Sequence, residues 1–323
     1  MERKNPLKEI YGTIDHGTAK EKMLSLPEFP KIIEFELTNH CNYKCIMCPT
    51  GLNTAKRSRG YMKEEIYHKI LGEMKNYKTA VKFVGQGEPF MHPNAMSYIE
   101  QMKKTGILVH ITTNGSFLTE DMMRRLVEIG VDSIKFSFQG VNADGYQLFR
   151  QKNVFEEYLA CIRRFSEIRG TSAFPFLTIG TSVIDESKQE IQCFKERCEQ
   201  YVDKVEVGIT SLEYVDFSHI KDEEKRKKFD DLKSKQKKYY KRYQVCPQIF
   251  DTIAIRWNGD ITACCSDMDG EMTLGNVESQ SILECWTGSK ENFYRKILAD
   301  GEYEKIPHCS KCYDIYGWTY GTN

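Results

Sequence analysis

The chain has 323 residues, of which 40% are hydrophobic and 28% charged, a length and composition that allow one large domain or two of ordinary size. Its 46 Lys and Arg residues balance its 46 Asp and Glu residues, which argues against nucleic-acid binding through bulk positive charge. No signal peptide is expected at the N-terminus, and no apolar run has the length of a transmembrane helix. Twelve cysteines without a secretion signal favour metal ligation over disulfides, so we expect a reducing cytoplasm and neither a membrane nor a nucleic-acid partner.

Strand-like and helix-like segments alternate through residues 31–215. Six strands are predicted, over residues 32–37, 80–84, 108–112, 133–138, 176–183 and 205–209. Helices are predicted between them, over residues 63–75, 94–104, 119–129, 154–168 and 188–200. This alternation indicates an α/β fold built from parallel βαβ units, either an open twisted sheet or a partial barrel.

Two neighbouring segments do not share this pattern. Residues 1–30 are expected to form an irregular N-terminal extension, with Pro27 and Pro30 marking its end. Residues 216–245 are dense in charges of both signs. We expect one solvated linker helix there, and the alternative is a docking surface for an acidic partner.

The most informative motif follows the first predicted strand, where Cys41, Cys45 and Cys48 form a CxxxCxxC cluster. Three thiolates leave one iron of a four-iron cluster without a protein ligand, and that iron is free to bind a small molecule. The alternatives are a structural zinc knuckle or buried thiols. Structural zinc sites prefer four ligands and commonly use CxxC pairs, which favours the iron–sulfur interpretation.

This spacing resembles that of the radical S-adenosylmethionine (SAM) superfamily. The resemblance implies a partial (β/α)6 TIM-like barrel over residues 31–215, with a [4Fe–4S] cluster on the three cysteines and SAM on the open iron. It also implies one-electron cleavage of SAM to methionine and a 5′-deoxyadenosyl radical, with a flavodoxin- or ferredoxin-type reductant. In such barrels the chemistry lies at the C-terminal ends of the strands.

Polar motifs follow the predicted strands at that end. The run Gly85-Gln86-Gly87-Glu88-Pro89 resembles the superfamily's GGEP motif, whose segment hydrogen-bonds the amino group of SAM; Gln86 replaces the second glycine. By the same resemblance, further candidates for SAM contacts are Asn114, Ser137, Gln139 and Arg150. Residues 178–183 lie where the superfamily has an adenine-contacting strand. For Arg150 the alternative is an ordinary surface charge.

A second group of cysteines lies near the C-terminus and comprises Cys246, Cys264, Cys309 and Cys312. The first two flank a strand–Asn-Gly–strand pattern that predicts a β-hairpin. From the residues alone, this group fits a zinc ribbon or a cluster with four protein ligands. The layout resembles the auxiliary-cluster domain of radical SAM enzymes, called twitch or SPASM, which implies a small domain over residues 246–323 with one auxiliary [4Fe–4S] cluster.

The remaining cysteines are expected to have other roles. Cys161, Cys193, Cys198 and Cys285 lie in helical apolar patterns and are expected to be packed thiols. Cys265 follows Cys264 directly, so on a strand its side chain would point to the opposite face. It is expected to be either a packed thiol or a catalytic hydrogen-atom donor to a substrate radical.

The spacing of the auxiliary cysteines resembles that of superfamily members that oxidise a cyclitol alcohol. This resemblance implies two-electron oxidation of an alcohol on a sugar, cyclitol or related small molecule, with the auxiliary cluster as electron acceptor. The alternatives are an epimerase of a sugar or a ribosomal peptide that uses Cys265, a peptide-maturation enzyme, and a non-catalytic zinc and iron–sulfur module. The last of these predicts no SAM cleavage.

Overall fold

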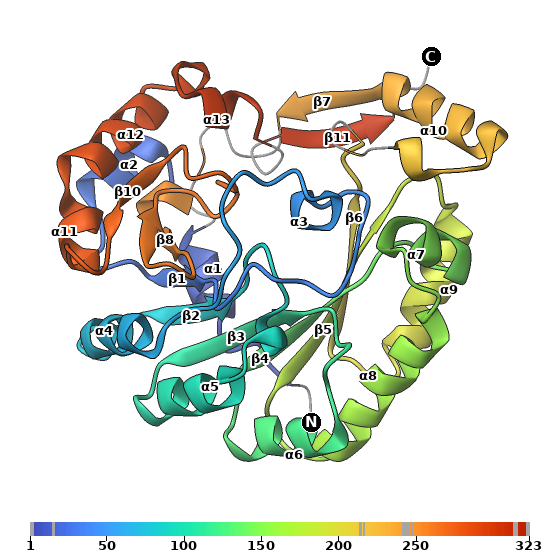
Figure 1. The fold of residues 1–323 in the computed structure, drawn as a ribbon, viewed down its shortest axis with the longest axis horizontal. Helices are drawn as coiled ribbons and strands as arrows, with labels where there is room; N and C mark the ends of the chain where they lie inside the picture. Colours follow the sequence, from blue (N-terminus) through green and yellow to red (C-terminus); the bar gives the residue numbers. More distant parts are fainter. Residues whose placement is uncertain are drawn as a thin grey trace.

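The computed structural model describes residues 3–14, 17–212, 215, 217–240, 246, 248–312 and 316–320. Six parallel strands form an arc that stays open at its last strand, β6 (Figure 1). Neighbouring strands follow the chain order and pair in parallel, so the expected partial barrel is confirmed. The strands are β1 (Ile32–Phe35), β2 (Ala80–Phe83), β3 (Leu108–Thr113), β4 (Ser133–Ser137), β5 (Phe176–Val183) and β6 (Lys204–Ile209).

Helices cover the outer face of this arc. The main core lies between them and the sheet, where alternate strand residues such as Ile33, Phe35, Val81 and Phe83 are fully buried or nearly so. The other strand residues therefore face the concave side. The covering helices are α4 (Glu64–Met74), α5 (Ala95–Lys104), α6 (Glu120–Glu128), α8 (Phe155–Arg169) and α9 (Lys188–Cys198). All five overlap predicted helices; α6 begins after an N-cap at Thr119, whose side chain accepts from the Met122 amide.

The predicted hairpin is present and extends the same sheet. Strands β8 (Thr252–Ile255) and β9 (Asp260–Thr262) are antiparallel, and Gly259 in the turn has φ +85°. Strand β8 pairs in parallel with β1, in the register Ile32↔Thr252, and β10 (Thr273–Asn276) adds a further antiparallel strand. The C-terminal region is thus joined to the barrel through a ladder of backbone hydrogen bonds. Its helices are α11 (Ile282–Thr287), α12 (Ser289–Ala299) and α13 (Pro307–Ser310).

The N-terminal extension differs from the expectation. It contains two short helices, α1 (Lys8–Ile14) and α2 (Ala19–Leu24), in place of irregular chain. A capping box between Thr18 and Glu21 starts α2. Leu7 and Tyr11 pack on β1 to β3, and α2 packs against α12. Both helices depend on these tertiary contacts, because helices this short are marginal in isolation.

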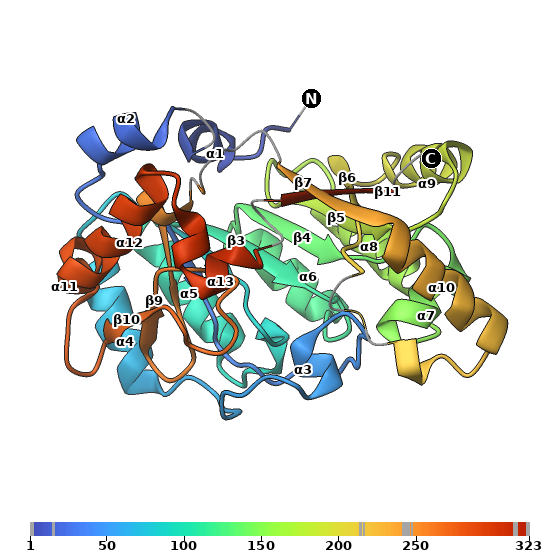
Figure 2. The same ribbon diagram turned by 90° about the horizontal axis from the view of Figure 1, so that it is seen from above.

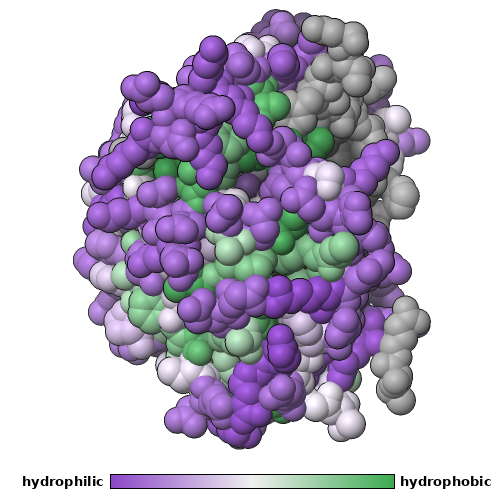
Figure 3. Space-filling view, turned by 90° about the vertical axis from the view of Figure 1, so that its right-hand side faces the viewer, coloured by the Kyte–Doolittle hydropathy of each residue, from purple (hydrophilic) through white to green (hydrophobic). Residues whose placement is uncertain are grey.

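The charged segment also differs from one continuous helix. Helix α10 covers Glu223–Lys235, and strand β7 (Gln236–Tyr240) then pairs antiparallel with β11 (Tyr316–Tyr320) between α13 and α10 (Figures 1 and 2). Residues 216 and 241–245 of the predicted linker lie outside the described residues, as do 1–2, 313–315 and 321–323 of the terminal segments. The side of the molecule that carries α8, α9 and α10 is mainly hydrophilic (Figure 3). None of the helices in the described ranges is long and apolar enough to cross a membrane.

Candidate active site

The first cysteine group occupies the loop between β1 and the short helix α3 (Pro49–Leu52). Cys48 is the N-cap of α3, and its amide donates to the Cys45 carbonyl at 3.1 Å. The loop is tied to the end of α7 (Ala143–Arg150) by the Ile46 amide, which donates to the Phe149 carbonyl at 3.0 Å. The CxxxCxxC loop is thus held by both flanking elements.

Two hydrogen-bond donors approach the sulfur atoms of this loop. Asn114 Nδ2 lies 3.8 Å from Cys41 Sγ, and Arg150 Nη1 lies 3.8 Å from Cys45 Sγ. Burial raises the pKa of the Cys41 thiol to about 11 and also raises the pKa of Cys45, where the Arg150 guanidinium opposes the rise. Iron binding has to displace these protons, and the two donors would then stabilise the thiolates.

The cysteines fit an iron–sulfur cluster by their chemistry and loop placement. The pKa of Cys41 responds to the charges of both Cys45 and Cys48, so the three thiols lie in one electrostatic neighbourhood. Within the described residues, no three His, Cys, Asp or Glu side chains stand in a ready-made metal-binding group. The loop therefore supplies the right donors, and the cluster would complete their arrangement.

The GxGEP run packs directly against this loop. A Cβ on Gly87 would meet the Thr38 carbonyl oxygen at 2.3 Å and the His40 carbonyl oxygen at 2.5 Å, so only glycine fits there. The Gln86 amide donates to a Glu36 carboxylate oxygen at 3.1 Å. A Cβ on Gly85 would meet Glu36 Cγ at 2.7 Å. Both glycines thus serve close packing of the run against β1 and the cysteine loop.

Glu88 has its carboxylate directed at protein groups. It accepts from Thr113 Oγ1 and from the Asn114 amide, each at 2.7 Å, and its residue is 2% exposed. Burial raises its pKa to about 7, although these donors work in the opposite direction. The side chain therefore connects the GxGEP run to the end of β3, which leaves the backbone of the run for a ligand.

The other predicted SAM contacts gather near the ends of β4 and β5. Ser137 closes β4. Gln139 Nε2 donates to the Ser182 carbonyl at 2.9 Å and to Thr210 Oγ1 at 2.7 Å, so its amide nitrogen binds neighbouring strand ends. Arg150 is not an ordinary surface charge, because its Nη2 donates to the Phe138 carbonyl at 2.9 Å and its buried Nε lacks a hydrogen-bond partner within the described part of the chain.

The second cysteine group is assembled from three separate segments. Cys246 precedes the hairpin, Cys264 follows β9, and Cys309 and Cys312 lie in and just after α13. Burial raises the pKa of Cys246 well above its usual value, and the charges of Cys312, Cys265 and Cys309 add to the rise. His308 Nε2 lies 3.5 Å from Cys264 Sγ. The predicted auxiliary cysteines are therefore close together in the fold.

The expectation for Cys265 was wrong in its geometry. Strand β9 ends at Thr262, so the alternation of a strand does not apply to Cys264 and Cys265. A hydrogen bond with Cys265 that favours the protonated Cys264 thiol is the largest cause of the raised pKa of Cys264, so the two thiols are adjacent. Cys265 also contributes to the electrostatics of Lys82 on β2. This thiol is thus next to Cys264, and its charge also acts on Lys82.

Charged residues on that concave face were not singled out from the sequence. Lys82 Nζ binds Glu34 Oε1 at 2.6 Å, and Lys135 Nζ binds Glu206 Oε2 at 2.7 Å. Lys135 reaches β6 by passing over Gly180, whose added Cβ would meet Lys135 Cε at 2.2 Å. The alternation of charged and apolar residues along these strands indicates that the charged side chains share one face of the sheet. The same alternation is also typical of a sheet face that is merely exposed to solvent, so it does not identify a functional site.

Comparison with known proteins defines the class. Residues 35–193 match the radical SAM superfamily, and residues 246–313 match SPASM, an iron–sulfur cluster-binding domain. The chain is therefore a radical SAM protein with a C-terminal SPASM domain. The first domain binds SAM and a [4Fe–4S] cluster, and the second domain is an auxiliary iron–sulfur cluster-binding domain.

Several curated relatives match most of the chain. A tungsten-containing aldehyde ferredoxin oxidoreductase cofactor-modifying protein of Pyrococcus furiosus is 26% identical over 318 residues, covering 87% of each chain. An S-adenosyl-L-methionine-dependent 2-deoxy-scyllo-inosamine dehydrogenase of Niallia circulans is 21% identical, covering 88% of this chain and 93% of its own. The Streptococcus suis protein SuiB, solved with its precursor peptide SuiA, has the same fold with a TM-score of 0.66 at 16% identity, over 86% of this chain and 69% of SuiB.

Proposed function

We propose that this radical SAM enzyme oxidises an alcohol carbon of a sugar, cyclitol or related polar small molecule to a ketone. The observation that carries the proposal is the second cysteine group, which supplies four thiols for an electron-accepting cluster in a region joined to the barrel by the pairing of β8 with β1. The concave face of the barrel carries the Lys82–Glu34 and Lys135–Glu206 ion pairs. A polar face with ion pairs suits a hydroxylated substrate better than an apolar one. The relative from Niallia circulans, which is a dehydrogenase by name, supports the same reaction class.

Bound SAM supplies hydrogen-atom abstraction, and an auxiliary cluster supplies an electron acceptor. In the oxidation the carbinol carbon loses a hydrogen atom, the hydroxyl loses a proton, and one electron leaves to that acceptor. Cys41, Cys45 and Cys48 would hold the first cluster, and the backbone of residues 85–88 with Asn114, Ser137, Gln139 and Arg150 would surround SAM. Cys246, Cys264, Cys309 and Cys312 would hold one auxiliary [4Fe–4S] cluster. A flavodoxin- or ferredoxin-type protein would supply the initiating electron.

The test is anaerobic reconstitution of the wild type and of the Cys41→Ala/Cys45→Ala/Cys48→Ala variant, followed by iron and sulfide analysis. We expect roughly eight irons per chain falling to roughly four, at four per cluster. The wild type is then incubated with SAM, reductant and 2-deoxy-scyllo-inosamine or related aminocyclitols, and the products are analysed for a ketone. Roughly four irons falling to none, with zinc on the C-terminal cysteines, would remove the dehydrogenase reaction.

Epimerisation is the second candidate, because Cys265 is a further free thiol beside Cys264 that would serve as the hydrogen-atom donor. In that case Cys265→Ala would stop turnover after substrate radical formation, whereas a dehydrogenase would keep forming ketone. Turnover in deuterium oxide separates the two reactions, since an epimerase incorporates deuterium at the inverted carbon. Two other kinds of substrate replace the aminocyclitol in the same assay. They are an enzyme cofactor, suggested by the name of the Pyrococcus furiosus relative, and a precursor peptide, suggested by the SuiB structure.

A further inference from the structure

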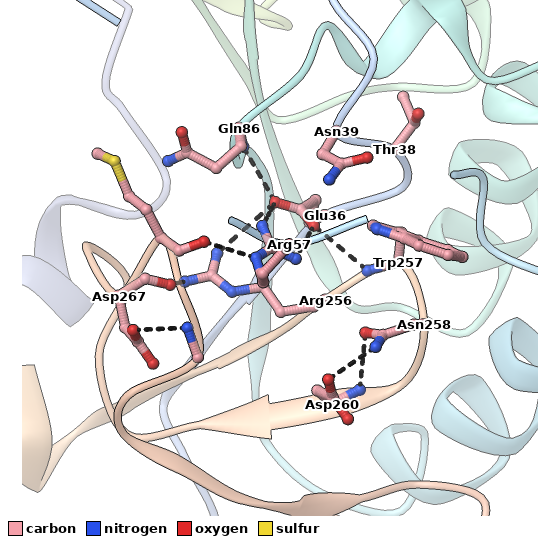
Figure 4. Close-up of polar contacts among 12 residues, drawn as sticks. Glu36, Thr38, Asn39, Arg57, Gln86, Arg256, Trp257, Asn258, Asp260 and Asp267 are labelled. Carbon is pink, nitrogen blue, oxygen red and sulfur yellow. Dashed lines mark hydrogen bonds and ion pairs between the residues drawn. The ribbon is translucent and has the colours of Figure 1, made fainter. Parts of the chain in front are cut away.

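A buried group of charges lies between the two cysteine loops. Glu36 directly follows β1, and its side chain is 0% exposed. Its two carboxylate oxygens accept from Arg57 Nη1 and Nη2, each at 2.9 Å, in a bidentate pair (Figure 4). The amide of Gln86, in the GxGEP run, donates to the same carboxylate at 3.1 Å. Glu36 is thus bound to the SAM side of the molecule from two directions.

The same carboxylate also faces the auxiliary side. Arg256, in the turn of the hairpin, places Nη1 3.8 Å from Glu36 Oε2, and its side chain is 4% exposed. Its Nη2 donates to the backbone carbonyls of Cys264 at 3.3 Å and Cys265 at 3.1 Å. The Arg256 guanidinium therefore bridges Glu36 and the two cysteines that follow β9.

Further contacts hold the loop that follows β9, residues 263–272, beside the two arginines. Arg256 Nη2 also donates to the Asp267 carbonyl at 2.5 Å, and Arg57 Nε donates to the Met268 carbonyl at 2.7 Å. The Asp267 carboxylate accepts from Thr262 Oγ1 at 2.8 Å and from the amides of residues 270–272, each at 2.9 Å. Figure 4 shows Arg57 and Arg256, which come from different segments, converging on Glu36 beside this loop. The two guanidinium groups are consequently held by backbone carbonyls of this loop as well as by Glu36.

We propose that Glu36 and Arg256 are positioning residues that set the reduction potential of the auxiliary cluster. The proposal rests on the proposed function, which assigns Cys264 as a ligand of that cluster. Arg256 brings a buried positive charge to the backbone of Cys264, and a positive charge favours the reduced, more negative state of a cluster. The negative charge of Glu36 lies beside the Arg256 guanidinium and partly cancels its effect on the reduction potential. An acceptor that takes one electron from a substrate depends on such a potential.

The two charges give the proposal a distinctive test. Reconstituted wild type, Glu36→Gln and Arg256→Gln are titrated anaerobically, and the auxiliary cluster is followed by electron paramagnetic resonance. We expect Arg256→Gln to shift its midpoint potential to a more negative value and Glu36→Gln to shift it to a more positive one. Both variants break the same ion pair, so a merely structural role would move both potentials in one direction or leave both unchanged, and either result would overturn the proposal.

Two further variants keep the result interpretable. Lys22→Met removes another buried ion pair with the C-terminal region, Lys22 Nζ to Asp251 Oδ2 at 2.6 Å, and we expect an unchanged potential. Arg256→Lys keeps the charge, so it should retain a potential closer to wild type than Arg256→Gln, even if the glutamine variant folds poorly. A wild type that binds iron for only one cluster would overturn both the proposed function and this inference. Two clusters with unshifted potentials would overturn the inference alone.

Discussion

The two cysteine groups differ in how the chain builds them. Cys41, Cys45 and Cys48 lie within one loop after β1, so a single local segment supplies the whole ligand set. The auxiliary cysteines come from the segment before the hairpin, the loop after β9 and the region of α13. The first site therefore requires a correctly formed loop, whereas the second requires the tertiary structure of a whole domain.

The supporting contacts follow the same division. The first loop is held by groups at the ends of neighbouring strands, such as Asn114 beside Cys41 and Arg150 beside Cys45. The auxiliary group is held by a small hydrophobic core that includes Ile249, Leu298 and Cys309 itself. Damage to this second core should release the auxiliary cluster and spare the first one.

Loss of one ligand from each group is expected to have the largest effect. Cys45→Ala should lower SAM cleavage by more than about 100-fold, because changes outside the ligand shell of a metal site already cost up to that factor. Cys309→Ala should remove the auxiliary iron and ketone formation but leave SAM cleavage. Iron analysis and the yield of 5′-deoxyadenosine measure both. Cys193→Ala, at an exposed thiol in α9, is the matched control and should change neither quantity.

Arg295 offers a way to break the second site without touching its cysteines. Its side chain is 1% exposed, lies 3.9 Å from the Trp286 ring centroid, and donates to the carbonyls of Ile249 and Trp286. Arg295→Met would leave these buried acceptors without a donor, which should lower the free energy of unfolding by about 3–5 kcal/mol. Urea unfolding of the apo-protein measures the change, and auxiliary iron should be lost while SAM cleavage persists.

Glu291 provides the control for this substitution. It lies 3.5 Å from Arg295, but burial raises its pKa to about 8, so its carboxyl group is mostly uncharged near neutral pH. Glu291→Gln should consequently change the free energy of unfolding by less than about 1 kcal/mol. An effect as large as that of Arg295→Met would mean that the ion pair, and not the bonds to the carbonyls, stabilises this core.

The elements of the barrel were predictable because each has a local signature. The strands and helices over residues 32–209 overlap the observed ones, since buried strands and capped amphipathic helices show in the order of the residues. Helices α1 and α2 escaped prediction, because each is short and depends on packing against distant strands or against α12. The pairing of β8 with β1 joins segments far apart in the chain, and no local pattern indicates it.

The parts of the candidate site that have a local sequence motif were predictable, and the parts that depend on contacts between distant segments were not. Both cysteine groups were found from spacing, together with the GxGEP run. The role of Glu88 was not, because its partners Thr113 and Asn114 are identified only when β2 and β3 are neighbours. Likewise, Cys265 was placed by strand alternation, and the strand ends before it. The Glu36–Arg256 contact depends on the non-local pairing of β1 with β8 and thus has no sequence signature.

Glu88 gives the first site a pH dependence of its own. Burial raises its pKa from 4.5 to about 7 in the folded chain, so the folded state binds this proton more tightly than the unfolded state. The associated stability is fully present below about pH 4.5 and is lost as the pH rises through about 7, with a total of about 3 kcal/mol. Urea unfolding of the apo-protein across this range measures it. In Glu88→Gln this component should disappear, and an unchanged slope would assign it to another group.

Gly87 packs against the first cysteine loop, whereas Gly72 lies in α4 away from it, so substitutions of the two glycines can be compared. An added Cβ on Gly87 meets two backbone oxygens within 2.5 Å, and backbone cannot turn aside as a side chain can. Gly87→Ala should therefore lower the free energy of unfolding by about 1–3 kcal/mol and weaken SAM binding by displacing the cysteine loop. Gly72, inside α4, has nothing within 4 Å of an added Cβ, so Gly72→Ala should raise stability by about 0.5–1 kcal/mol. Equal effects of the two substitutions on SAM binding, measured by calorimetry after reconstitution, would contradict a specific role for the Gly87 contact.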